Sequence, residues 1–75
     1  MGGTMAIKEE TFGQKLYKAR LALTSEEIEI AAQTLQNVNS LETITLLRGT
    51  RGWSLEKATA AMRAGREVNA TSPAE

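Results

Sequence analysis

The chain has 75 residues, and nine Lys and Arg residues balance nine acidic residues, all of which are Glu. It contains no Cys, His or Asp. These absences exclude disulfides, thiolate nucleophiles, zinc sites of the usual Cys/His kind and any mechanism that needs a histidine base. Hydrophobic residues make up 41% of the sequence, as in a folded protein. A domain this small buries only roughly 60% of its unfolded surface, so self-association or a partner is an expected source of stability.

The two ends of the chain lack a helical pattern. Residues 1–8 include two glycines, and residues 67–75 contain Pro73 with no apolar period. We therefore expect disordered tails at 1–8 and 67–75 around one helical domain at 9–66. No apolar run approaches the ~20 residues that cross a bilayer, and residues 1–10 lack the apolar core of a signal peptide. We accordingly expect a cytoplasmic protein with no membrane contact.

The first predicted helix covers residues 9–23. Apolar residues recur there in steps of four, three and four, which places them on one helical face: Phe12, Leu16, Ala19 and Leu23. Tyr17 and Leu21 form a second, lateral apolar pair at i,i+4 spacing.

The second predicted helix follows the sequence Thr24-Ser-Glu-Glu27, which has the pattern of a capping box. Apolar residues then follow at i, i+3, i+4 and i+7, the template of an amphipathic helix: Ile28, Ala31, Ala32 and Leu35. We expect this helix to end at Asn37.

The third predicted element starts at a cap on Asn39 or Ser40. The β-branched run at residues 43–45 also fits a short strand, which leaves residues 41–47 open between the two structures. The cap and the leucine spacing favour a helix. Gly49 and Gly52 bracket the expected break, and Gly52 is a natural left-handed terminator.

The fourth predicted helix is capped by Ser54, and Trp53 before the cap can form a hydrophobic staple with Ala58. Its apolar face ends at Gly65, where we expect the helix to end. The sequence thus predicts an all-α fold, a small bundle of three to four short helices. We expect a homodimer, because a single copy has only a small core rich in alanine.

No catalytic or metal-binding constellation stands out. Glu26, Glu27 and Glu29 lie at the start of a helix, where carboxylates commonly favour the positive end of the helix dipole. We therefore expect a protein that is not an enzyme and holds no cofactor or metal.

Charge is divided into segments along the chain. Residues 24–47 carry four Glu and no base, whereas residues 48–66 carry five basic residues and only Glu56. This alternation is typical of helices that pair within or between chains. The same pattern also allows 48–66 to present a basic face to an acidic partner. Trp53 fits either a staple over the core or an exposed anchor for that partner.

Residues 44–62 resemble the α-hairpin in the C-terminal domain of the ribosomal stalk protein L7/L12, and short L7/L12-like helical proteins share the pattern. The matching positions are Arg48, Gly49, Gly52, Leu55 and Ala58. In that family the hairpin carries lysines that recruit translation factors. The resemblance therefore implies a hairpin that docks onto other proteins.

The chain departs from that family at several positions. Thr45, Glu56 and Thr59 stand where basic residues are expected, and only Arg48 is retained. The strands that flank the hairpin in the stalk domain have no counterpart here. These departures point away from a stalk function, and a docking hairpin remains compatible with them.

The sequence favours a non-enzymatic protein-binding module, a small bacterial or phage regulator or inhibitor that docks a helical hairpin onto a larger protein. The expected docking residues are Arg48, Arg51, Trp53, Leu55, Lys57, Met62 and Arg63. The alternative is a DNA-binding regulator that uses residues 48–66, because residues 46–58 resemble the opening of a phage-repressor helix-turn-helix domain. That fold needs a further recognition helix, and a neutral net charge is atypical of it. A third possibility is a purely structural subunit of a permanent oligomer.

Overall fold

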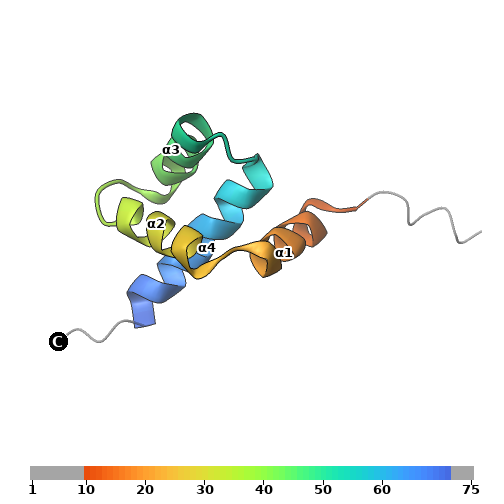
Figure 1. The fold of residues 1–75 in the computed structure, drawn as a ribbon, viewed down its shortest axis with the longest axis horizontal. Coiled ribbons are helices and arrows are strands. Elements are labelled where there is room, and N and C mark those ends of the chain that lie inside the picture. The colour runs from red at the N-terminus through yellow and green to blue at the C-terminus, as the bar shows by residue number, and fades with distance from the viewer. Residues whose placement is uncertain (1–9, 72–75) are drawn as a thin grey trace, which may run out of the picture.

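The computed structural model describes residues 10–71, which form four α-helices (Figure 1). The helices are α1 (Phe12–Ala22), α2 (Ser25–Leu35), α3 (Ser40–Arg51) and α4 (Leu55–Thr71). Within residues 10–71 there is no strand, so the all-α prediction is confirmed and the strand alternative for 41–47 is wrong. The predicted tail at 1–8 and the last part of the predicted tail at 67–75 lie outside the described residues.

The start of each helix is fixed by hydrogen bonds within a few residues. Thr24 and Glu27 form the predicted capping box of α2: Thr24 Oγ1 accepts from the Glu27 N–H at 3.1 Å, and Glu27 Oε1 accepts from the Thr24 N–H at 2.9 Å. Asn39 caps α3 by accepting from the backbone N–H of Glu42 at 2.7 Å. The hydroxyl of Ser54 accepts from the backbone N–H of Lys57 at 3.1 Å and so caps α4, as predicted.

Helix α1 begins later than predicted. Thr11 and Gln14 form a second capping box, with bonds of 3.1 Å and 2.9 Å. Because Thr11 has the extended backbone of an N-cap, the helix starts at Phe12 rather than at residue 9.

Helix α3 runs through Gly49 and ends at Arg51. Gly52 then adopts the left-handed conformation, with φ 71°. Its N–H donates to the carbonyl of Arg48 at 3.0 Å, and the N–H of Trp53 donates to the carbonyl of Leu47 at 3.3 Å. Glycine suits this position because it has no Cβ, and a residue with a Cβ would be strained at a positive φ.

Helix α4 is the centre of the fold. All three other helices pack against it, and α1 contacts α4 alone among the helices. Figure 1 shows α2 and α3 on one side of α4 and α1 on the other. The position of α1 in the domain therefore depends on its contact with α4.

The core between α2, α3 and α4 is built from small side chains, as the alanine-rich sequence predicts. Its buried members are Ala31, Leu47, Ala58 and Ala61, and the partly buried side chains packed on them are Leu23, Ile30, Ile44 and Trp53. The largest fully buried side chain is Thr43. Its hydroxyl donates to the carbonyl of Asn39 at 2.9 Å, so its polar atom is satisfied inside the helix.

The prediction that Gly65 ends the fourth helix is wrong. Gly65 is buried in the middle of α4, which continues to Thr71. A Cβ at Gly65 would lie 2.7 Å from the backbone nitrogen of Ala32 and 3.0 Å from the carbonyl carbon of Ala31. The glycine thus lets the backbones of α2 and α4 approach closely, and it does not terminate the helix.

Residues 67–71, predicted as part of a tail, are helical, and Asn69 ties this part of α4 to α2. The N–H of Gln36 bonds only three residues back, to the carbonyl of Gln33 at 3.1 Å. The carbonyl of Ala32 accepts instead from Asn69 Nδ2 at 3.0 Å, and Gln36 Nε2 donates to Asn69 Oδ1 at 3.4 Å. Asn69 therefore helps to satisfy the carbonyl end of α2, which a tail residue could not do.

None of the helices formed by residues 10–71 is both long and apolar enough to cross a membrane.

Candidate protein-binding surfaces

Three of the predicted docking residues face outward near the turn between α3 and α4. Arg48 and Arg51 are exposed in the last turn of α3, and Leu55, the first residue of α4, is 41% exposed. Neither arginine forms an ion pair within residues 10–71. The positions near the end of α3 favour these cations, because the carbonyl end of a helix is electronegative.

Two further predicted docking residues are engaged inside the domain. Lys57 Nζ lies 4.6 Å from the ring centroid of Trp53 and 2.8 Å from Glu27 Oε2. Trp53 is partly buried and packs against the core cluster. The structure therefore places Trp53 as the staple rather than as an exposed anchor. This cluster of Glu27, Trp53 and Lys57, here called the brace, ties the start of α2 to the start of α4.

The last two predicted docking residues lie elsewhere on α4. Met62 is 6% exposed, so its side chain is buried within the domain and does not lie on the surface. Arg63 is exposed, but it lines a groove between α4 and α1. The seven predicted residues thus do not form one surface. Those on α4 are separated because the side chains of this helix point toward three different helices, α1, α2 and α3.

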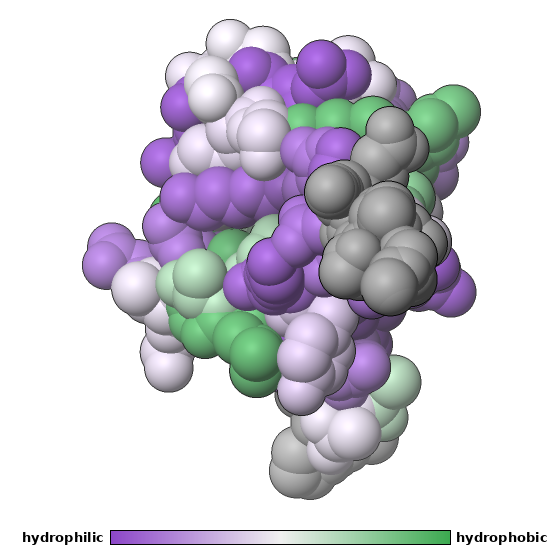
Figure 2. Space-filling model, turned by 90° about the vertical axis from the view of Figure 1, so that its right-hand side faces the viewer, coloured by the Kyte–Doolittle hydropathy of each residue, from purple (hydrophilic) through white to green (hydrophobic). Residues whose placement is uncertain are grey.

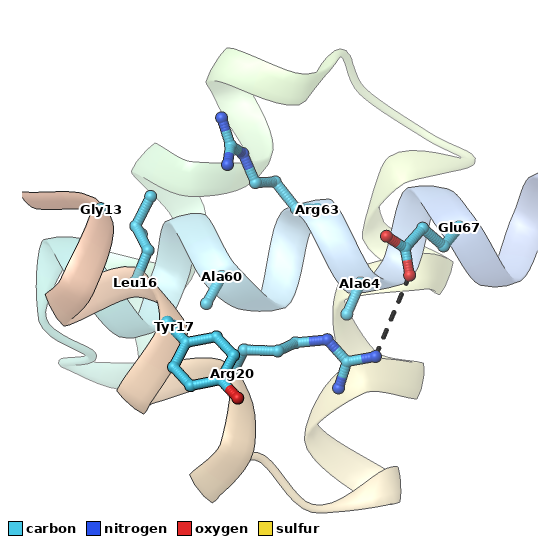
Figure 3. A pocket seen from close by; sticks show the side chains of 8 residues that line it. All are labelled: Gly13, Leu16, Tyr17, Arg20, Ala60, Arg63, Ala64 and Glu67. Carbon is cyan, nitrogen blue, oxygen red and sulfur yellow. Dashed lines mark ion pairs between the residues drawn. The ribbon is translucent and has the colours of Figure 1, made fainter.

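The groove between α1 and α4 was not predicted from the sequence. It has a volume of about 290 Å³, and Figure 3 shows its lining side chains. Leu16 of α1 and Ala60 and Ala64 of α4, all buried, form its floor. The rest of the lining comes from Gly13, Tyr17, Arg20, Arg63 and Glu67. Because Ala60 and Ala64 are small and one turn apart, the two helices leave space beside Leu16.

Polar groups flank this apolar floor. Arg20 reaches across the groove to Glu67, with 3.9 Å between Arg20 Nη2 and Glu67 Oε1 (Figure 3). Arg63 forms no ion pair with any residue between positions 10 and 71. Tyr17 and Leu21, the lateral pair seen in the sequence, are 66% and 67% exposed. The position of Tyr17 off the main apolar face of α1 is the sequence feature from which this groove could have been predicted.

The carboxyl of Glu27 is the group in the brace that titrates under acidic conditions. Its pKa is lowered below the usual range, first by the hydrogen bond from Lys57 and then by the backbone N–H of Thr24, while partial desolvation acts in the opposite direction. Because its pKa is lowered by folding, Glu27 stabilises the fold at pH values above the pKa that its carboxyl has in the unfolded chain. That contribution is lost as the pH falls through the lower, folded-state value.

We expect Glu27→Gln to lower the melting temperature at pH 7 and to have little effect at pH 3. Gln can still accept from Thr24 but lacks the charge that pairs with Lys57. Thermal unfolding followed by circular dichroism at both pH values checks this. Glu29→Gln is the control, because Glu29 is exposed and makes no ion pair within residues 10–71. An equal effect of both variants at pH 7 would contradict the role of the brace.

The other acidic side chains of residues 10–71 do not gather into a metal-binding group. Within the described part of the chain, no three His, Cys, Asp or Glu residues lie close enough together to hold a metal ion. Glu26 and Glu29 are exposed on α2. Comparison with protein families, curated proteins and solved structures gave no match to this chain.

Proposed function

We propose that this chain is a non-enzymatic protein-binding module that docks the hairpin of α3 and α4 onto an acidic surface of a larger protein. The observation that carries the proposal is the pair Arg48 and Arg51, exposed and without ion pairs within residues 10–71, beside the exposed side chain of Leu55. Arginine is enriched among the residues that dominate binding energy, and an adjacent apolar side chain adds contact area.

The turn that carries these residues is held in place by the domain itself. Gly52 ends α3 in a defined conformation, and Trp53 is fixed by Lys57 and the core. A surface held in one conformation binds with a smaller loss of entropy than a mobile one. The resemblance of residues 44–62 to the stalk-protein hairpin also favours a docking role. We place this role in a cytoplasmic regulator or inhibitor of bacterial or phage origin.

The test compares the proteins that three immobilised baits, wild type and two double variants, retain from a bacterial lysate. We expect Arg48→Glu/Arg51→Glu to lose at least tenfold of a partner that wild type retains, because two attractive charges become repulsive. The control Lys15→Glu/Arg66→Glu makes the same change in net charge at two exposed positions, on α1 and in the second half of α4, away from the turn between α3 and α4, and it should retain the partner.

Circular dichroism first establishes that all three proteins have equal helicity. Equal retention by all three, or equal loss in both double variants, would contradict the hairpin placement. Retention that disappears after nuclease treatment, with duplex binding that weakens steeply with salt, would support the DNA-binding alternative instead.

The expected homodimer is also part of the proposal. It is supported by large apolar side chains that are two-thirds exposed or more: Tyr17, Leu21 and Leu41. Sedimentation equilibrium tests it, and the mass of a single chain at all concentrations would contradict it.

A further inference from the structure

The groove between α1 and α4 has the features of a site for one large apolar side chain. Its floor of Leu16, Ala60 and Ala64 is apolar, and Tyr17 lines it as the one aromatic side chain. Its volume of about 290 Å³ lies just below the range of roughly 300–1,000 Å³ that is typical of small-molecule pockets. Figure 2 views the side of the molecule where α1 lies and shows apolar patches set among hydrophilic side chains. The groove therefore fits part of a peptide better than a whole cofactor.

The charges around the groove favour an acidic ligand. Five basic residues lie on α1 and the second half of α4, namely Lys15, Lys18, Arg20, Arg63 and Arg66. Against them stand only Glu10, paired with Lys18, and Glu67, paired with Arg20. Of these charged residues, Arg20, Arg63 and Glu67 line the groove, so its lining carries one more positive than negative charge in a chain whose net charge is zero.

The pair inside the groove is weak enough to be exchanged. The 3.9 Å between Arg20 and Glu67 exceeds the roughly 2.7–2.9 Å of a direct charged hydrogen bond. The Arg20 side chain is 47% exposed and that of Glu67 is 72% exposed, and exposed pairs of this kind contribute little to stability. An incoming carboxylate can therefore bind Arg20 in place of Glu67, and a second one can bind Arg63, which has no ion pair within residues 10–71.

We propose that this groove binds an acidic peptide segment of a partner protein. A Leu, Ile or Phe side chain of the peptide would rest on Leu16, Ala60 and Ala64 and against Tyr17. Glu or Asp residues beside it would pair with Arg20 and Arg63. This site is separate from the hairpin surface that carries Arg48 and Arg51, and it does not depend on the proposed function of that hairpin.

The test is a titration of the full chain, labelled with ¹⁵N, with three capped peptides followed by NMR. The acidic probe is acetyl-Glu-Glu-Leu-Leu-Glu-Glu-amide. One control replaces its glutamates with lysines, and the other replaces its leucines with serines. We expect the acidic leucine peptide to shift the amide signals of Leu16, Ala60 and Ala64 and to bind at least tenfold more tightly than either control.

Variants then locate the site. Tyr17→Ala and Arg63→Glu should each weaken binding of the acidic peptide at least tenfold, because they remove the aromatic wall and reverse a charge. Both positions are exposed, so these variants should retain the fold. Arg51→Glu makes the same charge change on the hairpin and should alter binding less than twofold.

Three results would overturn the inference. The first is the absence of shifts at millimolar acidic peptide, or equal binding of the lysine peptide. The second is an equal effect of Arg51→Glu and Arg63→Glu, which would indicate general charge attraction or the hairpin surface. The third is a dimer that Arg63→Glu dissociates while the peptide leaves it intact, which would make a second copy of the chain the occupant.

Discussion

Gly65→Ala is expected to lower the free energy of unfolding by about 2 kcal/mol. The added methyl group would lie 2.7 Å from the backbone nitrogen of Ala32, well inside the roughly 3.5–4.0 Å optimum for such contacts. The atoms that it meets are backbone, so no side chain can rotate away and α2 must move. Overpacking typically destabilises by 1–3 kcal/mol, and we expect the upper end here, about 3 kcal/mol. The better helix propensity of Ala offsets about 1 kcal/mol of this.

Thermal and urea unfolding followed by circular dichroism measure the effect, which should lower the melting temperature by roughly 10 °C. Gly49→Ala is the matched control. Gly49 is also helical, but a Cβ there meets nothing within 4 Å. It should therefore stabilise the protein by about 0.5–1 kcal/mol through propensity alone. Opposite signs for the two glycines are the expected result, and stabilisation by both would show that α2 and α4 do not approach closely.

Leu47→Ala is expected to destabilise the domain by about 2–5 kcal/mol, the range for deletion of a buried leucine side chain. Leu47 is 2% exposed and is the only large aliphatic side chain in a buried cluster otherwise made of Ala31, Ala58 and Ala61. These three alanine side chains are too short to fill the space that it leaves. Because small domains have total stabilities near the low end of about 5–15 kcal/mol, this variant should retain only about 0–3 kcal/mol of stability.

The control for Leu47→Ala is Leu41→Ala on the same helix. Leu41 is 73% exposed, so the change should fall within about 0.5 kcal/mol. Urea denaturation of both variants at 25 °C gives the comparison. Similar midpoints for the two variants would contradict the core as described.

The sequence located part of the candidate sites. Arg48, Arg51 and Leu55, which were predicted as docking residues, are exposed near the turn between α3 and α4. Trp53 and Met62 could not be assigned from spacing, because whether an apolar side chain meets a partner or the core depends on which helices surround it. The groove between α1 and α4 was missed for the same reason. It exists only because Ala60 and Ala64 happen to lie opposite Leu16.

The sequence by itself determined where α2, α3 and α4 start and where α3 ends. Those boundaries at Thr24, Asn39, Ser54 and Gly52 rest on hydrogen bonds and backbone preferences within six residues, which the local sequence contains. The tertiary structure decided the role of Gly65 and the length of α4. Both depend on α2, and the bond from Asn69 to the carbonyl of Ala32 joins residues 37 positions apart. A glycine that would end an isolated helix persists inside α4, because packing against a second backbone outweighs its low helix propensity.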